Sequence, residues 1–386
     1  MRIGIFGAGY VGYSCGIVLS KYNEIVFFEK DKNKINLINS GKSCITNFDT
    51  KDYNLNKISA LDCDQIDFFL YDIFVLALPT NYNPELKSLD ISLLEEIISK
   101  IYFHNPGSYI VVKSTLPIGS MRKFYDKFKN INLLYNPEFI RENFEIEDSI
   151  QPSRFIIGCH VRLNDSVFLS EYLSINQKIF QNKCNLYIVS PEEAEAIKLF
   201  SNSYLGMRIA FFNELDSFAR QNNLSTKNII AAVCDDKRIG NIYNNPSFGF
   251  GGYCLPKDIS CLSNSDIQLP IISSINYSNN ARAEFIVSEI NKKRVSRIGI
   301  YKLGMKKNSS NFKNSPVLKI LEKLANNYII SIYEPYLKQR YFLEYPIIND
   351  LDSFLNNNEL ILANRIEPTL EKSLDKVFTC DIFNQD

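Results

Sequence analysis

The stretch best suited to chemistry runs from Tyr243 to Asp258 and reads YNNPSFGFGGYCLPKD. It has too many glycines for the interior of a helix or strand, and it places Cys254 between these glycines and the pair Lys257-Asp258. A nearby lysine favours the thiolate, and glycines leave the sulfur accessible, so Cys254 is predicted to be a nucleophile. A lone cysteine is by default a small buried hydrophobe. We assign that packing role to Cys15, Cys159, Cys184 and Cys234.

A second candidate group lies on a predicted helix. Lys198 and Asn202 are four residues apart, so both project from one helical face, next to Glu195, and can meet a single ligand. Taken alone, charged residues at this spacing are more typical of a solvated surface. A thiol and a nucleotide fold in the same chain favour the functional interpretation.

A glycine-rich turn indicates nucleotide binding. Gly7-Ala8-Gly9-Tyr10-Val11-Gly12 follows an apolar strand directly and leads into a helix, which is the context that a dinucleotide fingerprint requires. Such a turn aims free N–H groups at a pyrophosphate. Glu29 ends the second predicted strand, where an acid can bond the ribose hydroxyls and repel the extra phosphate of NADP. Asp31 is an alternative for that contact, and Lys30 and Lys32 weaken the preference for NAD.

Two polar clusters follow predicted strands at residues 113–119 (KSTLPIG) and 136–142 (NPEFIRE). Open α/β sheets bind their ligands at the carboxyl ends of the strands. These clusters are therefore further candidates for the site.

The elements that position these residues follow a βαβ rhythm typical of a parallel, doubly wound sheet. The Ser190-Pro191 step and Glu193 predict a capped helix from Pro191 to about Asn223, roughly 45 Å long at 1.5 Å per residue. A helix of this length is expected to connect two domains. Strand-like sequence patterns begin again after Arg294, which predicts a second sheet. The expected strands are 2–6, 25–28, 74–78, 109–112, 133–135, 155–158, 297–301, 329–333 and 359–363.

Composition narrows the function classes. The chain has 386 residues, and its 43 Lys and Arg balance 43 Asp and Glu, so no global field favours nucleic acid or an anionic membrane. No apolar run reaches the roughly 18 residues of a membrane span. The nine cysteines form no CxxC pair, and the N-terminus resembles no signal peptide, which predicts reduced cytoplasmic thiols. Neither His104 nor His160 lies in a Gly-rich or acidic cluster, so we expect both to have packing or surface roles.

Together these residues resemble the UDP-glucose/GDP-mannose dehydrogenase family, and the similarity runs essentially end to end. The most specific string is Tyr243 to Asp258. The other matching stretches are residues 1–12, 79–83, 113–119, 136–142, 193–202, 212–216 and 364–365.

The resemblance implies an α/β fold with two Rossmann-like, doubly wound parallel-sheet domains, a long central helix and a small helical dimerisation domain. The expected domains are 1–190 for NAD, 191–293 for the central helices and the cysteine loop, and 294–386 for the UDP-sugar. It also implies a cytoplasmic homodimer that oxidises the C6 alcohol of UDP-glucose twice with NAD, for polysaccharide biosynthesis. No metal, nucleic acid or membrane partner is expected.

The resemblance also implies residue roles. Cys254 would form a thiohemiacetal and then a thioester, and Lys198 and Asn202 would stabilise the oxyanions. Asp258, Glu138 and Thr115 would handle protons and the hydrolytic water. The implied cofactor contacts are Gly7, Gly9, Tyr10, Val11, Gly12, Glu29, Lys34, Thr80, Thr115, Glu142, Tyr253, Lys257 and Lys313. The implied substrate contacts are Glu138, Phe139, Ile140, Arg141, Glu142, Lys198, Asn202, Tyr243, Asn244, Asn245, Pro246, Ser247, Gly251, Lys306 and Arg365, with Arg238 from a partner subunit.

The chain departs from the family pattern at two positions, and other functions remain open. Family members usually carry arginine where this chain has Lys313, and aspartate is commoner than Glu29. Lysine offers a point charge instead of a bidentate contact to NAD. One rival is the same reaction on GDP-mannose or a UDP-N-acetylhexosamine. Others are a one-step β-hydroxyacid-type dehydrogenase, which needs no thiol, and a silent NAD-binding protein.

Overall fold

The computed structural model describes residues 1–45, 55–305, 312 and 314–384. The chain divides into two compact units, Met1–Phe200 (unit 1) and Ser201–Asp386 (unit 2), each with its own sheet. The long helix α7 (Pro191–Gln221) contributes residues to both units. The boundaries of the three expected domains remain a prediction.

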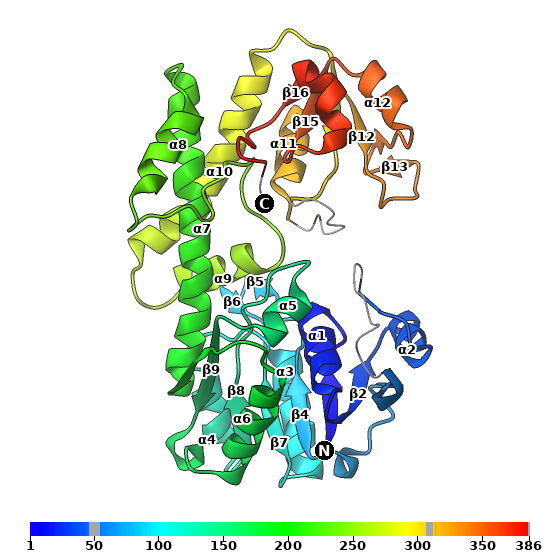
Figure 1. The fold of residues 1–386 in the computed structure, drawn as a ribbon, viewed down its shortest axis with the longest axis vertical. Coiled ribbons are helices and arrows are strands. Elements are labelled where there is room, and N and C mark those ends of the chain that lie inside the picture. The colour runs from blue at the N-terminus through cyan, green and yellow to red at the C-terminus, as the bar shows by residue number, and fades with distance from the viewer. Residues whose placement is uncertain (46–54, 306–311, 313, 385–386) are drawn as a thin grey trace. The chain divides into compact units, whose positions relative to one another are not determined.

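Unit 1 is built on an eight-stranded sheet with the order β10-β9-β8-β7-β4-β1-β2-β3 (Figure 1). Buried side chains fall into one cluster on each face of this sheet, and helices cover both faces. A doubly wound sheet results, as the alternating sequence pattern predicted. Its elements are β1 (Arg2–Phe6), α1 (Tyr10–Leu19), β2 (Glu24–Glu29), α2 (Lys32–Asn39), β3 (Ile58–Asp62), β4 (Ile73–Leu76), β5 (Tyr82–Asn83), β6 (Ser88–Leu89), α3 (Ser92–His104), β7 (Tyr109–Val112), α4 (Ser120–Lys127), β8 (Asn132–Tyr135), α5 (Glu145–Ile150), β9 (Arg154–Cys159), α6 (Val167–Ile179) and β10 (Asn185–Val189).

The sheet is parallel from β3 through β8, but β9 pairs with β8 in the antiparallel sense. The connection between these strands holds only the short helix α5, which packs on α1 instead of crossing back over the sheet. A parallel return needs a longer crossover. β10 then pairs with β9 in the parallel sense, and neither β3 nor β10 was among the expected strands.

Helix α7 begins where the capping motif places it. Ser190 N donates to Glu193 Oε2 at 2.8 Å, and Glu193 N donates to Ser190 Oγ at 3.4 Å. Ser190 Oγ also donates to Glu193 Oε2 at 2.8 Å, and the bonds from the Ser190 hydroxyl and N–H to this carboxylate lower the pKa of Glu193. The reciprocal pair satisfies two free N–H groups at the helix start, and the helix continues for 31 residues.

Unit 2 contains a four-stranded parallel sheet with the order β12-β11-β15-β16. Glu334 follows strand β12 (Ile329–Tyr333), and its Oε2 accepts from Leu303 N at 2.8 Å. Glu29, at the end of β2 in unit 1, accepts from Ala8 N in the same way. Helices α10 and α11 cover one face of the sheet and α12 the other. The elements after α7 are α8 (Thr226–Asp235), α9 (Cys254–Ser263), α10 (Pro270–Asn291), β11 (Arg297–Tyr301), α11 (Pro316–Leu324), β12 (Ile329–Tyr333), β13 (Tyr341–Phe342), β14 (Tyr345–Pro346), α12 (Leu351–Asn357), β15 (Leu360–Ala363) and β16 (Val377–Phe378).

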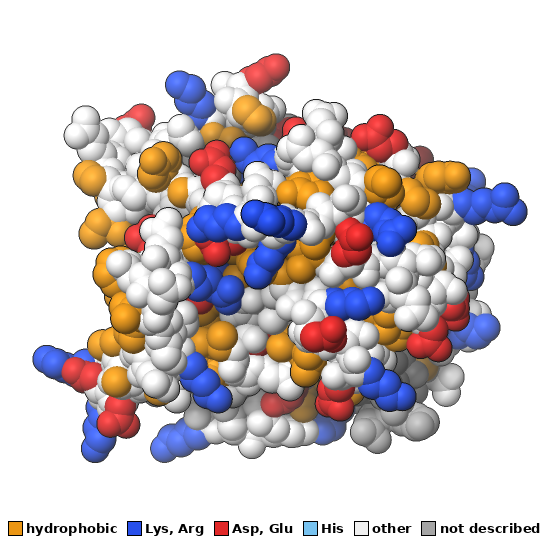
Figure 2. Space-filling view, turned by 90° about the horizontal axis from the view of Figure 1, so that it is seen from above, with side chains coloured by type: hydrophobic (Ala, Val, Ile, Leu, Met, Phe, Trp, Pro, Cys, Tyr) orange, Lys and Arg blue, Asp and Glu red, His pale blue; other side chains and the backbone are white. Residues whose placement is uncertain are grey.

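Figure 2 shows one face of the molecule, which carries both acidic and basic side chains, with several Lys and Arg side chains gathered near its middle. Within the described ranges, no helix combines the length and apolar character that a membrane crossing requires.

Candidate active site

The glycine-rich turn joins β1 to α1 as predicted. Gly7 has a φ of 93°, which lies in the left-handed region, and a side chain on Gly12 would collide with the carbonyl oxygen of Gly7. The space next to Gly9 is open, with no heavy atom within 4 Å of where a Cβ would stand. Tyr10 and Val11 form the first turn of α1. The turn therefore offers a bare backbone to a ligand at a helix N-terminus.

The Glu29 carboxylate lies against this turn. Its Oε2 accepts from Ala8 N at 3.0 Å and lies 3.7 Å from Lys34 Nζ, and its Oε1 accepts from Lys30 N at 2.9 Å. Asp31, the alternative ribose contact, instead caps α2 by accepting from Asn33 N at 2.9 Å. Glu29 is thus the acid that the fold places at the glycine turn.

The two polar clusters of unit 1 meet at the carboxyl ends of their strands. Thr80 Oγ1 donates to the carbonyl of Thr115 at 2.9 Å. Lys113 Nζ donates to Asn136 Oδ1 at 2.8 Å and forms an ion pair with Glu138. Burial disfavours the Lys113 ammonium, but the Glu138 carboxylate outweighs it and raises the pKa of Lys113. The cluster therefore holds a buried cation against the Glu138 carboxylate.

Lys198 reaches the same cluster from α7. Its Nζ donates to the carbonyl of Glu138 at 2.5 Å and lies 5.1 Å from the centre of the Phe139 ring. The side chain is buried, so Lys198 does not belong to a solvated helix face. Ile140 and Glu142 follow in the same loop and are half-buried. Arg141 forms an ion pair with Asp148 at 2.7 Å.

In unit 2, Cys254 is the first residue of α9 and the one exposed thiol among the nine free cysteines. A helix N-terminus stabilises a thiolate. One turn further on, the buried Asp258 accepts from Lys257 Nζ at 2.6 Å and from Asn202 Nδ2 at 2.5 Å. The Lys257 ammonium also lies 5.1 Å from the centre of the Tyr253 ring. This unit thus brings Asn202 and the Lys257-Asp258 pair together.

The loop before Cys254 is fixed by side chains from distant parts of unit 2. Ser247 N donates to Asn213 Oδ1 at 2.8 Å, and Phe248 N donates to Asn364 Oδ1 at 2.9 Å. Arg365 Nη1 donates to the carbonyl of Pro246 at 3.1 Å. Arg365 therefore lies next to the loop that the family resemblance links to the substrate.

The remaining predicted contacts differ in position. Tyr243 has a φ of 53°, and Asn244 is buried. A side chain on Gly251 would collide with the carbonyl oxygen of Asn314. Arg238 is exposed and paired with Asp236 at 2.6 Å. Lys306 and Lys313 lie outside the described residues.

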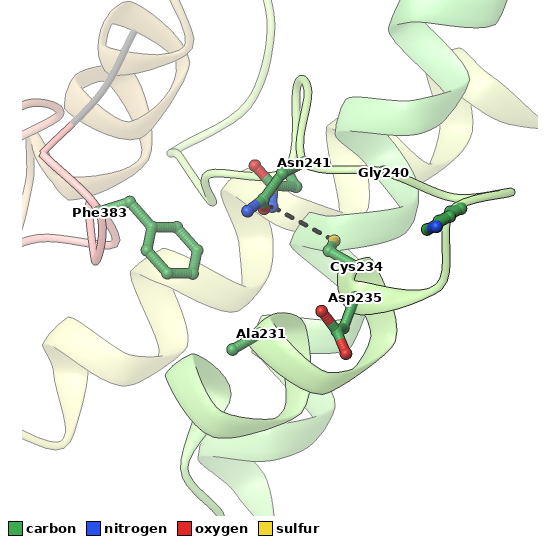
Figure 3. A pocket seen from close by; sticks show the side chains of 8 residues that line it. Ala231, Cys234, Asp235, Gly240, Asn241 and Phe383 are labelled. Carbon is green, nitrogen blue, oxygen red and sulfur yellow. Dashed lines mark hydrogen bonds between the residues drawn. The ribbon is translucent and has the colours of Figure 1, made fainter.

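A cavity of about 320 Å³ lies between the end of α8 and the loop that contains Gly240, Asn241 and Asn244 (Figure 3). Asn244 lines it and donates from Nδ2 to Cys234 Sγ at 3.2 Å, while the Phe383 ring comes from the C-terminal segment. No grouping of three or more His, Cys, Asp or Glu side chains suited to a metal occurs among the residues with described positions.

Comparison with known proteins agrees with this geometry. Residues 1–175 match the NAD binding domain of the UDP-glucose/GDP-mannose dehydrogenase family, and residues 192–281 match its central domain. The chain is 39% identical to a UDP-glucose 6-dehydrogenase of Campylobacter jejuni and 36% identical to one of Streptococcus pneumoniae, and each alignment covers all of both chains. The chain belongs to the UDP-glucose/GDP-mannose dehydrogenase family.

The fold of this family member also matches solved structures. A UDP-glucose dehydrogenase from Pyrobaculum islandicum superposes with a TM-score of 0.86 at 21% identity, covering 98% of this chain and 94% of that one. At this identity the match shows the fold alone, with its Rossmann-like sheet and central helix.

The structure adds residues of this dehydrogenase that sequence reasoning did not assign. Glu195 was noted only as a neighbour of Lys198, yet it is fully buried and accepts from Gly119 N at 2.5 Å and Met121 N at 2.8 Å. Burial raises its pKa to about 7, although these bonds oppose the shift. Glu195 thus fixes the end of the loop that contains Thr115 to α7.

A buried ion pair between Arg282 and Asp216, to which the sequence analysis gave no role, supports the loop at residues 244–247. Arg282 donates to the carbonyl of Ser247 at 3.0 Å and to Asp216 Oδ2 at 2.6 Å, and both charged side chains are buried. Asp216 also accepts from Arg220 Nε at 2.9 Å. The string 212–216 matched the family without a role, and a lone arginine in a long helix gave no signal, so spacing could not reveal this network.

Proposed function

We propose that this chain oxidises the C6 alcohol of UDP-glucose to a carboxylate in two NAD-dependent steps, through a thiohemiacetal and then a thioester on Cys254. The observation that carries the proposal is the exposed Cys254 thiol at the first residue of α9, four residues before an Asp258 held by Lys257 and Asn202. A dehydrogenase that performs one oxidation needs no such thiol. The curated relatives that match this chain over its full length are UDP-glucose 6-dehydrogenases.

The family's cofactor fits the residues of unit 1. The open space at Gly9 gives a pyrophosphate access to the backbone, and Glu29 lies at the end of β2, where it can bond ribose hydroxyls. Bound there, NAD supplies the hydride acceptor for both oxidations.

The residues of the chain supply the other steps. The first oxidation removes a hydride from C6 and a proton from its hydroxyl, and gives an aldehyde. The Cys254 sulfur then adds to the aldehyde carbon, and loss of a second hydride and of the hydroxyl proton leaves a thioester. Water attacks the thioester carbon, the carbon–sulfur bond breaks, and the carboxylate and the thiolate are released.

Roles follow from chemical type. The Lys198 ammonium and the Asn202 amide are donors that can stabilise the negative oxygen of a tetrahedral adduct. Asp258, Glu138 and Thr115 carry the oxygens that can accept protons or hold the hydrolytic water. Lys113 keeps the Glu138 carboxylate paired with a buried cation, which favours a role as base or water holder over proton donor.

The decisive experiment counts NADH formed per UDP-glucose consumed, in the wild type and in Cys254→Ser. We expect a ratio near two in the wild type and a fall in turnover on the order of 10³-fold or more in the variant. Cys184→Ser, at a half-buried thiol of unit 1, serves as the control and should match the wild type.

A ratio near one that is indifferent to Cys254→Ser would replace the proposal with a one-step dehydrogenase. Turnover of GDP-mannose or a UDP-N-acetylhexosamine, with none of UDP-glucose, would move the proposal to that nucleotide sugar, since every proposed catalytic residue would be unchanged.

We further propose a cytoplasmic homodimer. Tyr204, Phe211 and Phe218 are exposed on α7 and fall within an arc of about 40° at 100° per residue, so they form an apolar stripe. The nine free cysteines agree with a reducing compartment. Light scattering should give twice the 44.4 kDa chain mass, and Phe211→Glu should lower it toward that mass. A wild type that scatters as 44.4 kDa would contradict the dimer.

A further inference from the structure

The C-terminal segment Thr379–Asn384 contains a buried carboxylate, Asp381, that bonds to two loops of unit 2. Its Oδ1 accepts from Asn245 Nδ2 at 2.7 Å and from Asn384 N at 2.8 Å. Its Oδ2 accepts from Ile366 N at 3.1 Å. One carboxylate therefore satisfies three donors from three places in the chain.

Two of these donors adjoin residues proposed to bind the substrate. Asn245 is itself one of those residues, and Ile366 directly follows Arg365, whose guanidinium reaches the carbonyl of Pro246. Asp381 thus ties the loop at 244–247 to the end of β15, and it fixes the separation between Asn245 and Arg365.

The segment is well anchored. Arg220 Nη2 donates to the carbonyl of Thr379 at 3.0 Å. Ile382 and Phe383 pack against a buried cluster formed with α7 and α8, and Phe383 faces the cavity that Asn244 also lines (Figure 3). Asn245 Oδ1 accepts from Ile382 N at 3.1 Å, so both ends of the Asn245 amide bond to this segment. The C-terminal segment therefore determines the orientation of the Asn245 amide group.

We propose that Asp381 is a positioning residue for the UDP-sugar, which it never touches. It acts by holding Asn245 and Arg365 in the arrangement that receives the nucleotide. This inference rests on the proposed function. A carboxylate is required because all three partners are donors, whereas an amide would turn an NH₂ group toward one of them.

The test compares Asp381→Asn with Asp375→Asn, which removes the same charge at an exposed position of unit 2. For Asp381→Asn we expect KM for UDP-glucose and the calorimetric Kd for UDP to rise roughly tenfold or more. KM for NAD should be unchanged and kcat should stay within about threefold, because the reacting groups keep their places. Asp375→Asn should match the wild type in every constant.

Thermal unfolding separates positioning from folding. If Asp381→Asn folds poorly, Asp381→Ser keeps a small acceptor and should show the same rise in KM without loss of kcat. The proposal is overturned if folded variants bind UDP as the wild type does, if KM for NAD rises equally, or if neither variant folds. Wild type that binds UDP but does not oxidise UDP-glucose would reject the proposed sugar, and the UDP Kd would still decide the role of Asp381.

Discussion

The glycine turn of unit 1 (Gly7–Gly12) and the cysteine loop of unit 2 (Tyr243–Cys254) are both glycine-rich, but different contacts hold them in shape. The glycine turn is shaped by its own backbone and by one acid, Glu29, which lies 21 residues from Ala8 in the chain. The cysteine loop is held by side chains much further away, at separations of 34 residues for Asn213, 116 for Asn364 and 136 for Asp381.

The two segments differ in how far along the sequence the residues lie that determine their conformation. A turn that depends on glycines and on hydrogen bonds within one βαβ unit carries its conformation locally. A long irregular loop has no repeating backbone partners, so buried side chains must satisfy its N–H and C=O groups. The cysteine loop is accordingly sensitive to changes far from Cys254.

The largest effect should follow loss of the buried arginine behind the cysteine loop. Arg282→Met leaves Asp216 partly uncompensated in the interior, and we expect a loss of about 3–5 kcal/mol in the free energy of unfolding. Urea unfolding measures it. Arg297→Met, at an exposed arginine of the same unit, should change little. Equal stability of the two variants would mean that the loop does not depend on its distant supports.

A smaller and more local effect should follow a change in the glycine turn. Gly12→Ala places a methyl group against the Gly7 carbonyl, so the turn must shift, and the Kd for NAD should rise on the order of 100-fold. The Kd for UDP should not change. Gly107→Ala, where a Cβ meets open space, is the control. Unaltered NAD affinity in Gly12→Ala would refute the view that this turn encodes its own shape.

The smallest effect should come from Glu195, whose buried carboxyl group is favoured in its protonated, neutral form. Its folded pKa of about 7 lies above its ordinary value of 4.5, so the folded protein binds this proton more tightly. The stabilisation is fully present below about pH 4.5 and is lost as the pH rises through 7, which amounts to about 2 kcal/mol between pH 5 and 7.

Glu195→Gln should lack this component when unfolding is followed across that pH range. Glu171→Gln, at an exposed position of α6, should keep the wild-type dependence. Parallel pH curves for Glu195→Gln and the wild type would contradict the assignment.

Much of the fold could be predicted from sequence, because periodic apolar runs and caps act locally. Strands β1, β7, β11 and β12 begin and end at the expected residues, and α7 begins at Pro191. The antiparallel β8–β9 pair was not predicted, because strand direction depends on the path of the connection and leaves no mark in either strand. The expected pairing of Lys198 and Asn202 on one ligand remains a prediction.

The site divides in the same way. The Gly7–Gly12 turn and Glu29 follow from spacing, and the structure brings them together. Cys254 stood out for its neighbours in sequence, and its exposure at the start of α9 agrees with that interpretation. Arg282 and Asp381 gave no usable signal, and Asn364 belonged to a matching stretch without an assigned role, because each acts through a partner that only the folded chain brings near.

The sequence separation between the cysteine loop and its supports also determines when the loop can fold during synthesis. The loop emerges from the ribosome more than a hundred residues before Asn364 and Asp381, so it must wait for them in an unfinished conformation. All eight strands of the unit 1 sheet come from residues before Phe200, so this sheet can form while translation continues. A nascent chain that stalls before Asn364 would therefore contain the strands of the unit 1 sheet and a cysteine loop that lacks two of its supports.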